Sequence, residues 1–208
     1  LLLEARADTV LDTYTDYTAL HAAAFNGHVS CLEQLIAAKA NLNRLQTSHG
    51  NSAVNLAVKN KQPDTIRRLI QAKADISLSN SNDMTPLMMA CLSANVGAVQ
   101  LLIEAKARVN KADSINGTSA VYWAARKGLV RVSELLISAK ADVNAAITGG
   151  HSPIHAAADS GHTRTVRLLL QAKVDINQRY NGRTAAQRAA SNGHSETLQL
   201  LLNAKAEV

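Results

Sequence analysis

The stretch that decides the fold spans residues 136–144 and reads Leu-Ile-Ser-Ala-Lys-Ala-Asp-Val-Asn. Close variants of this stretch begin at five other positions along the chain, namely Leu35, Leu69, Leu102, Leu169 and Leu201. Self-similarity at a fixed period is the signature of a repeat architecture. We therefore interpret the chain as six copies of one structural unit before considering any single motif.

The spacing of a second repeated block divides each copy into a constant and a variable part. This block begins with Ser or Thr at residues 18, 52, 85, 119, 152 and 184, so the starts lie 34, 33, 34, 33 and 32 residues apart. A lysine follows each start after a constant 21 residues. All variation in length falls between that lysine and the next start. This pattern is expected if the constant part is packed and the connecting segment is a surface loop.

Two short helices are predicted within each constant part. The Ser or Thr at its start can cap the first helix, and a proline follows directly at Pro86 and Pro153. The second helix carries apolar residues at helical spacing, as at Val29, Leu32 and Leu35. A glycine separates the two helices in four copies, at Gly27, Gly128, Gly161 and Gly193. Aromatic residues make up only 3% of the chain, and this favours closely packed helices over a β-sandwich.

The first-helix block resembles the Thr-Pro-Leu-His-x-Ala signature of ankyrin repeats. The similar segments are Thr18-Ala-Leu-His-Ala-Ala, Thr85-Pro-Leu-Met-Met-Ala and Ser152-Pro-Ile-His-Ala-Ala. The resemblance covers essentially the whole chain and implies an all-α ankyrin-repeat solenoid of stacked helix-turn-helix units with β-turn fingers. Its concave side would consist of fingers and first helices.

We expect a single domain over residues 1–208 that is a fragment of a longer protein. A partial repeat, with the tail of a preceding helix, is expected in residues 1–12. The complete repeats are expected to start near residues 13, 47, 80, 114, 147 and 179.

One departure from the family pattern recurs in every copy, because lysine follows the second helix where the family usually has glycine. These residues are Lys39, Lys73, Lys106, Lys140, Lys173 and Lys205, with Arg6 in the partial copy. A non-glycine residue in the left-handed conformation costs about 1 kcal/mol. Either the helices end differently here, or the chain tolerates that cost repeatedly.

The repeated lysines also account for the net charge of +6, since without these seven cations 15 basic residues would face 16 acidic ones. They could form a basic stripe for an acidic partner, a nucleic acid or a membrane surface. Alternatively, each cation complements a helix dipole and keeps the edge soluble. We favour the second interpretation, because nucleic-acid binding would be expected to add stacking aromatics or an arginine cluster.

Histidines and cysteines do not predict a chemical site. His151 and His155 have a spacing that a metal site could use. However, the resemblance places His21 and His155 at the signature position, where the imidazole bonds to neighbouring backbone and ties repeats together. Cys31 and Cys91 fall at small apolar helix positions and are predicted to be buried thiols. With no nucleophile–base pair or phosphate loop, we expect no enzyme, no metal and no cofactor.

The asparagines at the bases of the fingers are predicted to hydrogen-bond locally and hold the turn. They are Asn43, Asn110, Asn144 and Asn177.

Cysteine usage and hydropathy bear on the compartment. Two cysteines in 208 residues exclude a disulfide scaffold and favour a reducing intracellular compartment, cytoplasmic or nuclear. No apolar run approaches the roughly 20 residues that span a bilayer. The opening Leu1-Leu2-Leu3 is followed by Glu4 and Arg6, unlike a signal peptide. We therefore expect neither secretion nor membrane insertion.

A solenoid presents an extended surface, and this favours a non-enzymatic protein–protein interaction module acting as a monomer. An alternative is a targeting or regulatory ankyrin domain of a larger multidomain enzyme, adaptor or bacterial effector. A third interpretation, a basic nucleic-acid-binding solenoid, rests on the lysines alone and is disfavoured.

The candidate partner-binding residues lie in the fingers and first helices, which hold all six aromatic residues. Arg126 is expected to pair with an acidic group and Trp123 to supply apolar area, whereas Tyr122 is expected to fill a gap between repeats. The full candidate set is Tyr14, Tyr17, Phe25, Asn26, His49, Asn51, Lys59, Asn60, Asn82, Met84, Leu92, Ile115, Trp123, Arg126, Lys127, His151, Tyr180 and Arg183.

Overall fold

The computed structural model describes residues 10–12 and 16–207. The chain forms two compact units, Leu1–Ala107 and Arg108–Val208. The single domain expected over 1–208, with its repeat boundaries, stays a prediction. The helix tail expected before the first repeat lies outside the described residues.

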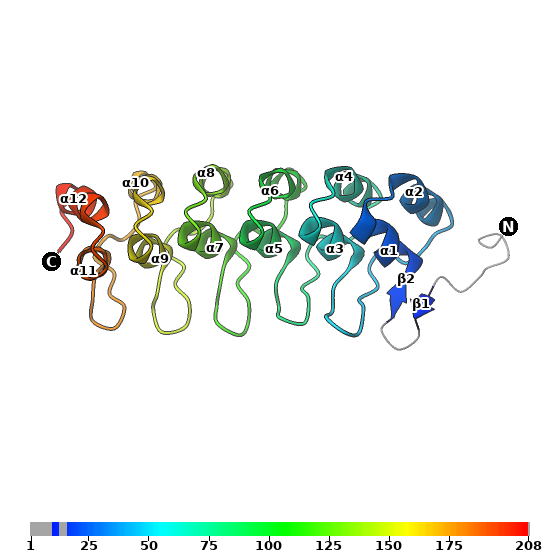
Figure 1. Ribbon diagram of the computed structural model, residues 1–208, viewed down its shortest axis with the longest axis horizontal. Coiled ribbons are helices and arrows are strands. Elements are labelled where there is room, and N and C mark those ends of the chain that lie inside the picture. Colours follow the sequence, from blue (N-terminus) through cyan, green and yellow to red (C-terminus); the bar gives the residue numbers. More distant parts are fainter. Residues whose placement is uncertain (1–9, 13–15, 208) are drawn as a thin grey trace. The chain divides into compact units, whose positions relative to one another are not determined.

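The first unit contains three helix pairs. These are α1 (Ala19–Asn26) with α2 (Val29–Ala37), α3 (Ala53–Lys59) with α4 (Pro63–Gln71), and α5 (Pro86–Leu92) with α6 (Val96–Glu104). The first helices α1, α3 and α5 pack side by side in one layer, and α2, α4 and α6 pack in a second layer (Figure 1). Ahead of α1, strands β1 (Val10–Asp12) and β2 (Tyr17–Thr18) pair antiparallel, a feature that the sequence did not predict.

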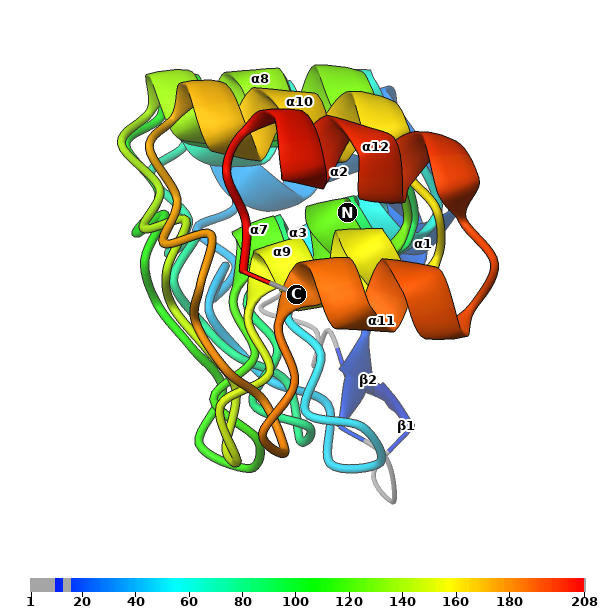
Figure 2. The same cartoon turned by 90° about the vertical axis from the view of Figure 1, so that its left-hand side faces the viewer.

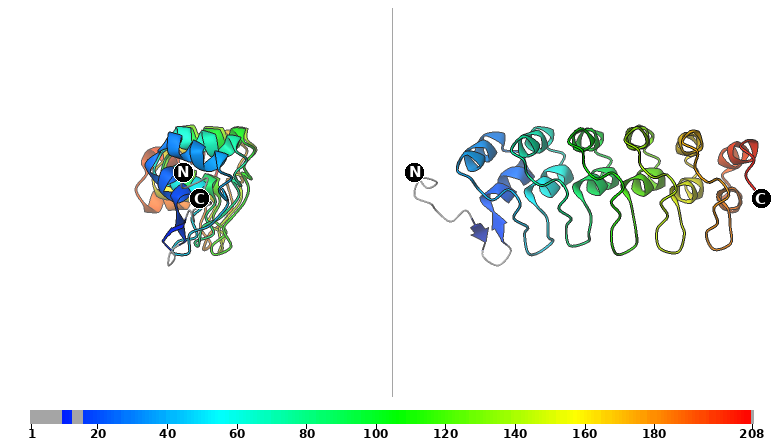
Figure 3. Two further views of the ribbon diagram at one scale, coloured as in Figure 1. Left: turned by 90° about the vertical axis from the view of Figure 1, so that its right-hand side faces the viewer. Right: turned by 180° about the vertical axis from the view of Figure 1, so that it is seen from behind.

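The second unit repeats this arrangement with three more pairs. These are α7 (Ala120–Arg126) with α8 (Val130–Ser138), α9 (Pro153–Asp159) with α10 (Thr163–Gln171), and α11 (Ala185–Ser191) with α12 (Ser195–Asn203). Seen from the C-terminal side, α12 lies above α11 (Figure 2). The view from behind shows the same two layers within each unit, with the fingers projecting beyond the first helices (Figure 3). The described residues therefore form the predicted all-α repeat fold.

The predicted caps begin all six first helices. Thr18, Ser52, Thr85, Ser119, Ser152 and Thr184 are the N-cap residues. In five of them the side-chain oxygen accepts a hydrogen bond from the backbone N–H three residues later. Each such bond satisfies one amide of the first turn that has no partner within the helix.

The repeated lysines end the second helices in the left-handed conformation. All six have φ between 60° and 66°. After α6, for example, Lys106 N–H donates to the Ile103 carbonyl and Ala107 N–H donates to the Leu102 carbonyl. These two bonds form a Schellman motif, which normally ends in glycine. Of the two alternatives open from the sequence, the chain therefore tolerates a strained non-glycine residue in every copy.

The finger asparagines do not bond locally, so that prediction is wrong. Each side-chain oxygen accepts a hydrogen bond from a backbone N–H of the following repeat. Asp75 N–H donates to Asn43 and Asp142 N–H donates to Asn110, both at 2.8 Å. The local turn is instead held two residues earlier, where the carboxylate of Asp142 accepts the Asn144 N–H. Each asparagine therefore links its own finger to the backbone of the following repeat.

The core consists of aliphatic side chains between the two helix layers. Of the two cysteines predicted to be buried, only one is. Cys91 is buried, which raises the pKa of its thiol to about 12. Cys31 is exposed. At the same register of α12, the Thr197 hydroxyl faces the preceding second helix α10 and bonds to the Thr163 hydroxyl. In the described residues α2 follows no other second helix, so nothing covers Cys31.

The signature histidines tie successive repeats together as the resemblance implies. The Nε2 of His21 lies 3.0 Å from the Arg44 carbonyl, and that of His155 lies 2.9 Å from the Gln178 carbonyl. Both imidazoles are fully buried, and their Nδ1 atoms lie within hydrogen-bond distance of the helix cap. Each histidine therefore fastens a first helix to the next finger.

Candidate partner-binding surface

In each unit a cavity lies between fingers and first helices. The unit 1 cavity has a volume of about 370 Å³. Its lining combines apolar side chains with amides and a lysine: His49, Asn51, Lys59, Asn80, Asn82, Met84, Met89, Leu92 and Ser93. Methionine side chains are flexible and adapt to different apolar partners. This cavity is therefore suited to an apolar side chain.

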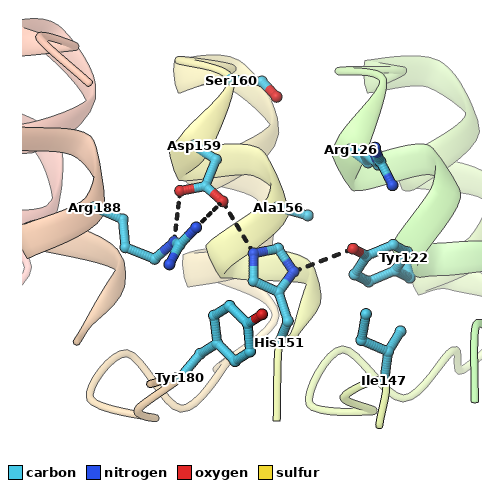
Figure 4. A pocket seen from close by; sticks show the side chains of 9 residues that line it. All are labelled: Tyr122, Arg126, Ile147, His151, Ala156, Asp159, Ser160, Tyr180 and Arg188. Carbon is cyan, nitrogen blue, oxygen red and sulfur yellow. Dashed lines mark hydrogen bonds and ion pairs between the residues drawn. The ribbon is translucent and has the colours of Figure 1, made fainter. Parts of the chain in front are cut away.

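The unit 2 cavity has a volume of about 300 Å³ and a more polar lining (Figure 4). It is lined by Tyr122, Arg126, Ile147, His151, Ala156, Asp159, Ser160, Tyr180 and Arg188. These residues come from α7, α9 and α11 and from the two fingers between them. Three successive repeats thus contribute side chains to one site.

A chain of hydrogen bonds crosses the unit 2 cavity from α7 to α9. The Tyr122 hydroxyl lies 3.1 Å from His151 Nδ1, and His151 Nε2 lies 3.0 Å from an Asp159 carboxylate oxygen. A carboxylate only accepts hydrogen bonds, so Nε2 carries the proton that it donates. In the neutral imidazole Nδ1 is then the acceptor for the Tyr122 hydroxyl. Burial lowers the pKa of His151 and outweighs the opposing effect of Asp159, which agrees with the neutral form.

Arg188 completes this network from α11. Its Nε and Nη2 atoms lie 2.5 and 2.6 Å from the two carboxylate oxygens of Asp159. Burial alone would raise the pKa of Asp159, but the hydrogen bonds from Arg188 and His151 hold it below its usual value. The Tyr180 ring lies against both groups, with its centroid 4.6 Å from that of His151 and 5.1 Å from the Arg188 guanidinium carbon. The wall of the cavity is therefore rigidly held.

The structure brings nine of the predicted binding residues into these two cavities. Six line the unit 1 cavity, namely His49, Asn51, Lys59, Asn82, Met84 and Leu92. Three line the unit 2 cavity, namely Arg126, His151 and Tyr180. Asn51 and His151 are only 4% and 8% exposed, so they shape the walls and offer little area to a partner.

The other predicted residues lie outside these two cavities. Arg183 lines a smaller cavity of about 70 Å³ beside Asp159 and Arg188. Asn26 and Asn60 donate to carbonyls of their own helices. Ile115 is 61% exposed in its finger. Tyr17 stacks on His21, while Phe25, Trp123 and Lys127 lie on first helices or directly after them. Tyr14 lies outside the described residues.

Sequence reasoning missed Asp159 and Arg188 as members of the site. Asp159 stands seven residues after its helix cap, and a signal was present at that register. The six copies carry Phe25, Lys59, Leu92, Arg126, Asp159 and Ser191 there. The preceding register carries small apolar residues, and in the first five copies these are fully buried. A register that varies in size and charge, beside one that keeps small apolar residues, indicates a surface free of packing constraints.

Within the described ranges 10–12 and 16–207, no group of three or more His, Cys, Asp or Glu side chains is arranged to hold a metal ion. In the same residues no helix is long and apolar enough to cross a membrane.

Comparison with known proteins finds matches along most of the chain. Family models described as "Ankyrin repeats (3 copies)" match residues 1–80 and 54–147, and one described as "Ankyrin repeats (many copies)" matches residues 154–202. The chain is 34% identical over 86 residues to the transient receptor potential cation channel subfamily A member 1 homolog of Caenorhabditis elegans, which covers 41% of this chain and 7% of that protein. It is 31% identical over 95 residues to the neurogenic locus Notch protein of Drosophila melanogaster, which covers 46% of this chain and 4% of that protein. The matching segment thus covers less than a tenth of the length of either relative.

Proposed function

This chain belongs to the ankyrin-repeat family, and we propose that it binds a partner protein on the face formed by its fingers and first helices. Ankyrin repeats are generally protein-interaction modules without catalytic activity. The observation that carries the choice of face is the position of the two cavities. Each is formed by fingers and first helices of successive repeats, and each contains residues from the variable register.

The chemistry of the two cavities supports a role in specific recognition. In the unit 1 cavity, Met84, Met89 and Leu92 offer apolar area beside the exposed Lys59. The lining of the unit 2 cavity includes two guanidinium groups and two tyrosine rings, beside the polar groups of His151 and Asp159. Interface hot spots are enriched in Trp, Tyr and Arg that lie in or beside pockets. The outer face of the second helices carries charged side chains instead, among them Arg67 and Glu134.

A photo-crosslinking experiment tests the choice of face. A photoreactive amino acid is placed at Leu92 or Ile115, and in matched variants at Arg67 or Glu134. We expect a partner from cell lysate to be crosslinked from the first two positions only. Leu92→Asp should then weaken binding of that partner at least tenfold, whereas Arg67→Ala and Glu134→Ala should leave it within twofold. If Arg67→Ala and Glu134→Ala abolished binding while Leu92→Asp did not, the proposed face of fingers and first helices would be wrong.

A second candidate function is that of a targeting or regulatory domain within a larger multidomain protein, such as an enzyme, an adaptor or a bacterial effector. It is supported by the relatives, in which the matching segment is a small part of a long chain. Deleting this domain from the full-length protein should then change where that protein acts or how its activity is controlled. An unchanged distribution and activity would exclude this role.

A further inference from the structure

The two arginines that line the unit 2 cavity differ in their partners. Arg188 is committed to Asp159 through two hydrogen bonds, and Asp159 also accepts the His151 N–H. Both oxygens of that carboxylate are therefore engaged. The Arg126 guanidinium, by contrast, forms no ion pair with any carboxylate of the described residues. It is the cation of this cavity that is available to an incoming group.

Arg126 is exposed, yet its side chain is held by two uncharged neighbours, the Tyr122 hydroxyl, with which it interacts, and the Trp123 ring. Its guanidinium carbon lies 5.8 Å from the centroid of the Trp123 ring, and the two residues are three positions apart on one face of α7. A guanidinium over an indole ring gains cation–π attraction and loses side-chain freedom. The planar fork is thereby prepared for a planar anion, since less conformational entropy is lost when it binds.

The charge of the lining selects the kind of anion. Two guanidinium groups face one carboxylate, and His151 is neutral, so the cavity carries one unit of excess positive charge. An occupant with a single negative charge would neutralise it. A phosphate group carries nearly two negative charges near neutral pH, and it would leave an unbalanced charge beside Asp159. A cavity of about 300 Å³ also lies at the lower end of the ~300–1,000 Å³ typical of small-molecule sites, and this suits one side chain.

We propose that the unit 2 cavity receives an aspartate or glutamate side chain of the partner protein, and that Arg126 pairs with its carboxylate. Guanidinium and carboxylate groups match in shape and form two parallel hydrogen bonds. The Asp159–Arg188 pair acts here as a fixed wall, because it leaves neither an unpaired carboxylate to repel the occupant nor a loose arginine to compete with Arg126. This inference rests on the proposed function of the finger and first-helix face.

Selection from a displayed library of random peptides tests the proposal, followed by affinity measurements on synthetic peptides with amidated C-termini. We expect the selected peptides to share one Asp or Glu, and replacement of it by Asn or Gln to weaken binding at least tenfold. Arg126→Gln should weaken binding of the acidic peptide to a similar extent and binding of the neutral peptide very little. The effects of the protein substitution and the peptide substitution are then not additive. Arg126→Lys keeps the charge without the planar fork and should recover only part of the affinity.

The matched control is Arg131→Gln, which removes an exposed arginine from α8 in the same repeat. Arg131 is paired with Glu134 at 3.0 Å on the outer helix layer, so affinity should change less than twofold. Equal losses in Arg126→Gln and Arg131→Gln would mean that only net charge matters, and the proposal would be wrong. It would also be wrong if no acidic residue were shared among the selected peptides, if none were selected, or if a phosphoserine peptide bound more tightly than the glutamate peptide.

The same set of variants separates this inference from the proposed function. If Leu92→Asp weakens binding of the captured partner while Arg126→Gln does not, the finger and first-helix face binds the partner but the unit 2 cavity does not take its carboxylate. If neither change has an effect and Arg67→Ala does, the proposed face itself is wrong. Melting curves of each variant establish that it is folded before its affinity is compared.

Discussion

Arg188 on α11 reaches back to Asp159 on α9 and bonds both of its carboxylate oxygens, at 2.5 and 2.6 Å. The two helices belong to successive repeats, so this pair joins two repeats through residues that are 29 positions apart in the sequence. Both side chains are less than a quarter exposed. Such a pair is shielded from water more than the usual surface salt bridge.

Removal of Arg188 should therefore destabilise the fold. Arg188→Ala leaves the Asp159 carboxylate partly buried, with hydrogen bonds from His151 and, at 3.4 Å, from Asn192 but no paired cation. We expect the free energy of unfolding to fall by about 2 kcal/mol. Urea denaturation followed by circular dichroism measures this loss. Arg179→Ala is the control, because its partner Glu207 and Arg179 itself are more than half exposed. That change should cost less than about 0.5 kcal/mol, and equal losses would contradict the shielding of the Asp159–Arg188 pair.

Stability should fall as the pH drops below 6.5. Burial lowers the pKa of His21, His151 and His155 from the ordinary value of 6.5. The unfolded chain then takes up protons near pH 6.5 that the folded chain does not bind, so folding is favoured fully only above that pH. We expect a lower free energy of unfolding at pH 5.5 than at pH 7.5.

A pair of histidine variants identifies the groups responsible. His155→Gln should reduce the difference in stability between pH 5.5 and pH 7.5, because one buried imidazole is lost. The exposed His28→Gln should leave that difference unchanged. A pH dependence that is the same in both variants would assign it to other groups.

Replacing one of the strained lysines by glycine should raise the free energy of unfolding. Lys106 has φ of 62°, a conformation that costs a residue with a Cβ about 1 kcal/mol. Because Lys106 is exposed, Lys106→Gly should raise the free energy of unfolding by up to about 1 kcal/mol, less the entropy that glycine gains in the unfolded chain. Lys127→Gly serves as control, since Lys127 has φ of −96° and has no such strain to lose. If Lys127→Gly raised the free energy of unfolding, or Lys106→Gly lowered it, backbone strain would not be what determines the effect of glycine at these positions.

Asn55 occupies the register of the signature histidines without their bonds. It is fully buried on α3, and neither its side-chain oxygen nor its nitrogen has a hydrogen-bond partner. His21 and His155 each reach a carbonyl 23 residues later, and the corresponding carbonyl for this repeat belongs to Leu78. Asn55→His should form this bond and stabilise the fold by about 1–2 kcal/mol. The reverse change, His155→Asn, should destabilise by a similar amount, and urea denaturation measures both.

The residues of the candidate site were predictable to different degrees. Lys59, Leu92 and Arg126 were found because they end first helices, and the repeat register places those positions beside the fingers. Asp159 stands at the same register but was missed, because its function depends on Arg188 in the next repeat. Two residues of opposite charge 29 positions apart do not identify each other until the packing of α9 against α11 is known.

What the sequence by itself determined is the part of the fold that acts over a few residues. Caps such as Thr85 and the apolar spacing of Leu102 specify two helices per repeat, since capping bonds and helical periodicity are local. Only the tertiary structure decided which repeat satisfies Asn43, why Cys31 is uncovered and which carboxylate pairs with Arg188. These outcomes depend on what the neighbouring repeat places against each side chain, and packing across repeats leaves no local trace in the sequence.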